Sequence, residues 1–167
     1  MTGYETYQLA LELNPDLAGN VYTIYAAEGG EGATPPLSFP PAYQVASPFG
    51  ADIGGTPPLF WTVMPDAQWD SWLTIGPTDA SQMGSISSIN LDFASWTETQ
   101  GLSATDAAVF YMDPNNGPAA GDSPVVVIAQ LTVPSGTSFQ AIVSAQGKPP
   151  SMGVGETWAE TDITFNV

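Results

Sequence analysis

The sequence predicts an all-β fold, a single-domain β-sandwich or jelly roll with about ten strands and little helix. Segments with strand character recur at short intervals, and Gly, Pro, Asn and Asp separate them. The 17 Gly and 16 Pro interrupt the chain too often for long helices. Its 167 residues suit one domain, 1–167, with a full hydrophobic core.

The first strands follow two patterns. From Tyr7 to Leu13, apolar residues alternate with polar or small ones, which is the period of a half-buried strand. Val21–Ala27 is rich in β-branched and aromatic residues and forms the second predicted strand. The Pro- and Gly-rich stretch Glu28–Pro58 is the least regular part of the chain, and we expect it to wrap the sandwich.

The remaining strands complete the prediction. Ala107–Met112 and Val125–Val133 are largely apolar on both faces, which indicates central strands that are covered on both sides. A short helical turn is expected at Ser103–Asp106. Further strands are predicted at Tyr43–Ala46, Leu59–Val63, Trp69–Ile75, Ile89–Phe93, Phe139–Ala145 and Trp158–Val167.

The charge balance excludes several functions. The chain has 17 acidic residues and one base, Lys148, for a net charge of −16, and it has no Arg, His or Cys. Ser-His-Asp and Cys-His centres and ordinary zinc sites are therefore excluded. Nucleic acid is excluded as a partner because its phosphates need Lys and Arg. The cation that suits an excess of carboxylates is Ca²⁺.

Membrane insertion is not expected. No apolar run approaches the roughly 18 residues that span a bilayer. The first 20 residues lack a basic start and an apolar middle, so we expect no signal peptide in this stretch.

One local motif is a candidate cation site. Oxygen donors at Asp113 and Asn115 precede Gly117, and Asp122 follows. The pattern resembles the start of a calcium loop, although the Gly falls one position early and no Glu closes the loop. The alternative is an Asn-Gly turn between two strands.

Two tryptophan clusters are candidate binding surfaces. In a strand that begins at Trp69, Trp72 would share the outward face with Asp70, as a sugar platform or a subunit contact, unless a loop covers it. Near the C-terminus, Glu156, Glu160 and Asp162 surround Trp158, which indicates a cation site, a second platform, or an edge strand protected by charge.

Some segments resemble modules of large secreted proteins of aquatic microbes. The resemblance rests on Pro41–Gly55, Asp70–Gly76, Gln130–Pro134 and the turn at Gly147, and it runs from about Asn20 to the end. It implies an extracellular β-module without an assigned activity, and it carries over no functional residue.

Together these observations predict a non-enzymatic, self-assembling structural subunit of an extracellular or particle-surface filament, sheath or shell. Such a subunit would form a homo-oligomer or polymer, helped by salt or Ca²⁺. The alternative is a carbohydrate-binding module that takes a polysaccharide, with or without Ca²⁺. The third reading is a glycosidase with a pair of carboxylates, the one catalytic mechanism that the composition tolerates well.

Overall fold

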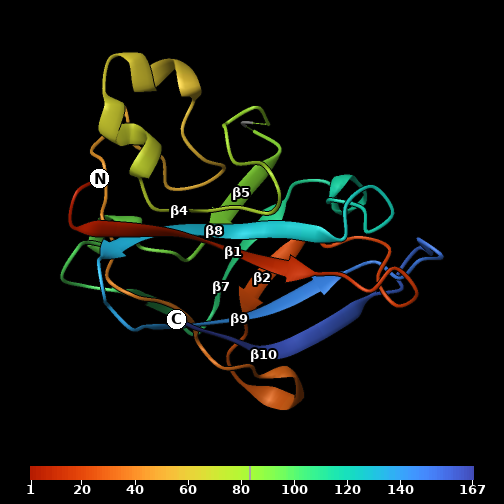
Figure 1. The fold of residues 1–167 in the computed structure, drawn as a ribbon. Helices are drawn as coiled ribbons and strands as arrows, with labels where there is room; N and C mark the ends of the chain where they lie inside the picture. Colours follow the sequence, from red (N-terminus) through yellow and green to blue (C-terminus); the bar gives the residue numbers. More distant parts are fainter. Residues whose placement is uncertain (83) are drawn as a thin grey trace.

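The computed structural model describes residues 1–82 and 84–167 (Figure 1). The strands are β1 (Tyr4–Glu12), β2 (Thr23–Ala26), β3 (Leu37–Phe39), β4 (Trp72–Leu73), β5 (Ile86–Ile89), β6 (Leu102–Ala104), β7 (Ala107–Tyr111), β8 (Val125–Pro134), β9 (Gln140–Gly147) and β10 (Trp158–Asn166). Short 3₁₀ turns are η1 (Gly30–Gly32), η2 (Pro58–Thr62), η3 (Pro65–Trp69), η4 (Phe93–Ser95) and η5 (Pro114–Asn116).

The strands form two antiparallel sheets. The smaller sheet has three strands in the order β1-β8-β4. The larger has seven, in the order β5-β7-β2-β9-β3-β6, with β10 paired to β9 outside this path. These ten strands in two layers confirm the predicted all-β sandwich with little helix.

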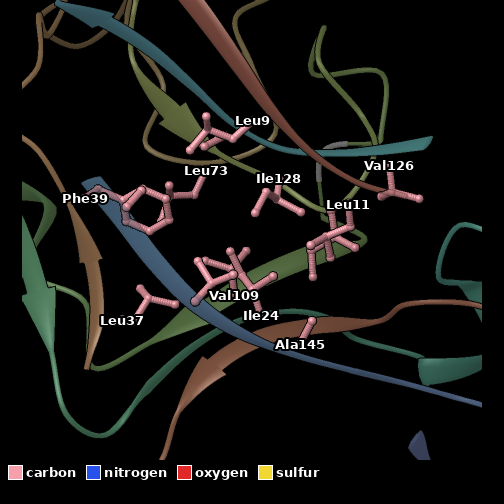
Figure 2. Close-up of a cluster of buried hydrophobic side chains, with 14 of the residues drawn as sticks. Leu9, Leu11, Ile24, Leu37, Phe39, Leu73, Val109, Val126, Ile128 and Ala145 are labelled. Atoms are coloured by element: carbon pink, nitrogen blue, oxygen red, sulfur yellow. The ribbon is translucent and has the colours of Figure 1, made fainter. Parts of the chain in front are cut away.

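The core lies between the two sheets. Figure 2 shows Leu9, Leu73 and Ile128 of the smaller sheet meeting Ile24 and Val109 of the larger one. All five are 5% exposed or less. Each of the strands β1, β2, β4, β7 and β8 contributes one of these side chains. Alternation along a strand places them, because successive side chains point to opposite faces of the sheet.

The strand β8 is buried on both faces, as its apolar sequence predicts. Its inner face contributes Leu131 and Val133 to the core, and its outer face carries the buried polar residues Gln130 and Thr132. The Gln130 amide donates to the carbonyl oxygens of Gln68 (3.1 Å) and Asp70 (2.8 Å). The end of η3 therefore covers the outer face of β8 and provides hydrogen-bond acceptors for the buried Gln130 amide.

The segment between β3 and β4 differs from the prediction. The expected strand Leu59–Val63 is the 3₁₀ turn η2, and the expected strand Trp69–Ile75 shrinks to β4 because η3 occupies Pro65–Trp69. Prolines stand at the first positions of both turns, where their fixed φ suits a helical turn and their missing N–H does no harm. Tyr43–Ala46 forms no strand, although the Tyr43 N–H donates to the Thr132 carbonyl oxygen (2.8 Å).

Two further strands lie where none is predicted, and a third, β5, shares only Ile89 with the expected strand Ile89–Phe93. β3 lies inside the stretch Glu28–Pro58, which was expected to be irregular, and β6 replaces the helical turn expected at Ser103–Asp106. The two strands pair with each other, and β3 also contacts β9 through Ser38. Both contain only three residues, so their own sequences show too little alternation to reveal them.

Within the described residues, no helix combines the length and the apolar character that crossing a bilayer requires.

Candidate functional site

Asp70 is a buried anchor of the loop before β4. Its side-chain oxygens accept hydrogen bonds from the N–H groups of Val45 (2.7 Å) and Ala51 (2.6 Å), and the residue is 0% exposed. Burial raises the pKa of Asp70 to about 6, although these hydrogen bonds and one from the Ser71 N–H act to lower it. Both carboxylate oxygens are thus committed to backbone donors, and neither faces a ligand.

Gly50 allows this anchor to form. A Cβ at this position would overlap the Val45 carbonyl oxygen and would lie 3.1 Å from Asp70 Oδ2. The loop can therefore close on the carboxylate only where no side chain intervenes.

The outward platform expected at Trp72 is wrong. Trp72 pairs with Gln130 of β8 and is only 2% exposed. The backbone of Asp52–Gly54 lies along the other edge of β4, where the Leu73 N–H donates to the Asp52 carbonyl oxygen (3.0 Å). Trp69 ends η3 and is half-buried, so it does not belong to a core-facing strand.

Residues Pro57–Met64, which we call the apolar protrusion, form an exposed hydrophobic surface. Leu59 is 75% exposed, Val63 72%, and Trp61 and Met64 36% each. Figure 1 shows η2, coloured for residues near 60, above β8. The stretch Ile53–Pro65 contains no charged residue. Exposed apolar side chains that gather in this way mark an interaction surface.

Contacts with neighbouring segments hold the apolar protrusion in place. The Phe60 ring packs edge-on against Phe49, with ring centroids 5.7 Å apart. The Trp61 indole N–H donates to Thr56 Oγ1 (3.0 Å), and the Thr56 hydroxyl donates to the Ala67 carbonyl oxygen (2.8 Å). These contacts fix the backbone while Leu59 and Val63 remain in water.

A second apolar surface lies between the two sheets, where β1 and β10 are neighbouring edges without a strand between them. We call it the seam groove; its volume is about 590 Å³. Its main apolar lining residues are Leu11, Leu13, Leu17, Trp158, Ile163 and Phe165. Glu12, Glu160 and Asp162 also line it, and all three are exposed. The seam groove therefore has an apolar floor and an acidic rim.

Trp158 is half-buried and lines the seam groove. Its indole N–H donates to the Asn20 carbonyl oxygen (2.9 Å), which fixes the ring at the start of β10. β10 is an edge strand that pairs only with β9 among the described strands, and its register shifts between Glu160 and Ile163. Asp162 within this irregularity has a φ of 60°. A bulge and charges on an edge strand oppose pairing with other chains.

Of the three residues of the predicted calcium site, Asp113 and Asn115 are in direct contact. Asp113 Oδ1 accepts hydrogen bonds from the Asn115 N–H (2.9 Å) and side-chain amide (2.8 Å) and thereby caps η5. The Lys148 ammonium donates to Asn115 Oδ1 (2.7 Å). Asn115 and Asp122 line a second groove, of about 590 Å³, which Asp113 does not line.

Within residues 1–82 and 84–167, no three acidic side chains gather closely enough to hold a metal ion. Calcium binding therefore stays a prediction. The cation that the structure places against Asn115 is the Lys148 ammonium.

No protein-family model, no curated protein and no solved structure matches this chain. The resemblance to secreted modules of aquatic microbes therefore stays a prediction.

Sequence reasoning missed both the apolar protrusion and the seam groove. The aromatic and β-branched residues of Leu59–Val63 predict a strand. The prolines on both sides and the lack of charge from Ile53 to Pro65 could have identified an exposed turn instead. The seam groove has no local signature, because its walls come from chain segments more than 120 residues apart.

Proposed function

We propose that this protein is a non-enzymatic structural subunit that associates with copies of itself through the apolar protrusion, in an extracellular or particle-surface assembly. The observation that carries the proposal is the exposure of Leu59 (75%) and Val63 (72%) on a stretch without charge. Large apolar side chains that remain in water favour association, because contact with another surface removes them from water.

Electrostatics supports the choice of this surface. Two copies that each carry a net charge of −16 repel one another over most of their surfaces. The region Ala33–Pro65 holds a single acidic residue, Asp52, and the other 16 acidic residues lie elsewhere in the chain. The apolar protrusion itself carries no charge, so contact through it brings fewer like charges together than contact through an acidic surface.

The free energy gained by burying these side chains predicts that a single contact between two copies is weak. Full burial of a Leu or Val side chain contributes roughly 1.5–3 kcal/mol. Leu59, Val63 and the half-exposed Trp61 and Met64 together provide several such contributions. Association of two proteins costs an estimated 4–15 kcal/mol in lost motion. Stable assembly therefore needs high local concentration or several contacts per subunit, as in a filament or shell.

The alternatives rank lower for a geometric reason. The carbohydrate platform depended on Trp72 and Asp70 as surface residues, and both are buried. A glycosidase needs two carboxylates that reach a sugar. Asp70 has a pKa raised to about 6, which suits a general acid, but its oxygens are committed to backbone N–H groups.

Light scattering and sedimentation test the proposal. We expect the wild-type chain to associate in about 1 M NaCl, where charges are screened beyond roughly 3 Å. The double variant Leu59→Ser/Val63→Ser should weaken association at least about tenfold, because it removes two apolar contacts. The control Val154→Ser removes a 99% exposed valine from a different loop and should associate like wild type. A wild-type chain that stays monomeric at high concentration in this salt contradicts the proposal.

A further inference from the structure

The apolar protrusion and the seam groove lie at distant parts of the molecule. In Figure 1, η2 stands at the upper left, above β8. The seam groove lies towards the right, where β1 ends and β10 begins. A separation seen in one projection is a lower bound on the true separation, so one molecule cannot fill its own seam groove with its own apolar protrusion.

The seam groove has room for apolar side chains from another molecule. Its volume of about 590 Å³ lies within the range of pockets that bury small ligands, about 300–1,000 Å³. Three side chains of the seam groove pack against the core but remain half-exposed: Trp158, Ile163 and Phe165. Leu17 stands at the groove and is 69% exposed. These side chains would lose further contact with water if an apolar segment entered.

The acidic rim restricts what can enter. Glu12, Glu160 and Asp162 repel any segment that carries carboxylates, and most exposed parts of this chain carry them. The apolar protrusion is exposed and apolar, and it lies within the charge-free stretch Ile53–Pro65. The apolar protrusion therefore suits the seam groove, because it is apolar like the groove floor and carries no acid that the groove rim would repel.

We propose that the apolar protrusion of one copy docks in the seam groove of the next copy. This inference rests on the proposed function and names the partner surface. Two different surfaces meet in such a contact, so each copy keeps one free apolar protrusion and one free seam groove. A contact of this kind repeats and builds a ring or an open filament.

Complementation between two variants tests this arrangement. The protrusion variant Leu59→Ser/Val63→Ser keeps an intact seam groove. The groove variant Leu17→Glu adds a charge at the seam groove and keeps an intact apolar protrusion. Both variants change residues at least 69% exposed, and circular dichroism and thermal unfolding check that each folds. Each variant alone should be monomeric in high salt, and a 1:1 mixture should form a species of twice the monomer mass.

The outcomes separate the two proposals. A wild-type chain that stays monomeric overturns both. If wild type associates and the groove variant associates equally well on its own, the docking inference is overturned, whereas association through the apolar protrusion stands. A mixture that remains monomeric while wild type associates also overturns the docking inference.

Engineered disulfides give a second test, because the natural chain has no cysteine. A disulfide requires Cα atoms about 4.4–6.8 Å apart. Copies that carry Val63→Cys, mixed with copies that carry Leu17→Cys, should cross-link into heterodimers under mild oxidation. The control pair Val63→Cys and Val154→Cys should cross-link at least about tenfold less. Equal cross-linking of the two pairs overturns the docking inference.

Discussion

At the scale of single residues, the burial of one carboxyl group sets a pH dependence of stability. Asp70 is 0% exposed, and burial raises its pKa from 3.8 to about 6. The folded state thus binds this proton more tightly than the unfolded state does. The stabilisation by protonation is complete below pH 3.8 and is lost as the pH rises through 6.

The free energy of unfolding should therefore rise by about 1 kcal/mol from Asp70 alone when the pH falls from 7.5 to 5. Urea unfolding at several pH values measures this slope. Asp70→Asn removes the titrating group, so the slope should decrease in the variant. Because the Asn amide nitrogen cannot accept a hydrogen bond from the Val45 or Ala51 N–H, the variant should also be less stable at both pH values. Identical slopes for both proteins would refute this role of Asp70.

At the scale of elements, the junction of β9 and β10 depends on a close approach. Gly147 ends β9 and pairs with Trp158 of β10. A Cβ on Gly147 would overlap the Asn20 carbonyl oxygen and would lie 2.6 Å from Trp158 Nε1. The same carbonyl oxygen accepts the Trp158 indole hydrogen bond, so one glycine permits the contact that holds β10 at the seam groove.

Gly147→Ala should destabilise the fold by about 1–3 kcal/mol, the usual cost of overpacking. Chemical denaturation measures the change. Gly121→Ala is the matched control, because no atom lies within 4 Å of the position that its Cβ would take. Equal stability of the two variants would show that β10 adjusts without cost.

At the scale of the whole molecule, the net charge of −16 opposes both compactness and association. Charges are screened beyond about 30 Å at 0.01 M ionic strength and beyond about 10 Å at 0.1 M. Repulsion between subunits should therefore weaken steadily as salt is added, while the hydrophobic contribution of the apolar protrusion remains.

Association should accordingly increase with NaCl even in the presence of a calcium chelator, and dilution into low salt should dissociate the assemblies. Sedimentation at a series of NaCl concentrations measures the effect. A parallel series in CaCl₂ at matched ionic strength separates screening from specific binding. If NaCl had no effect and only CaCl₂ promoted association, bridging by Ca²⁺ would replace screening as the explanation.

The sequence by itself determined the all-β architecture, and it excluded catalytic centres and zinc sites that need His or Cys. Alternation from Tyr7 to Leu13 and the apolar run Val125–Val133 identify strands, because side-chain direction in a strand depends only on the local chain. Only the tertiary structure decided which surfaces face water. Trp72 is buried although it lies outside the core cluster between the sheets, whereas Leu59, in the turn η2 with proline at its first position, is exposed. Burial depends on what lies opposite a residue, and no local pattern contains that information.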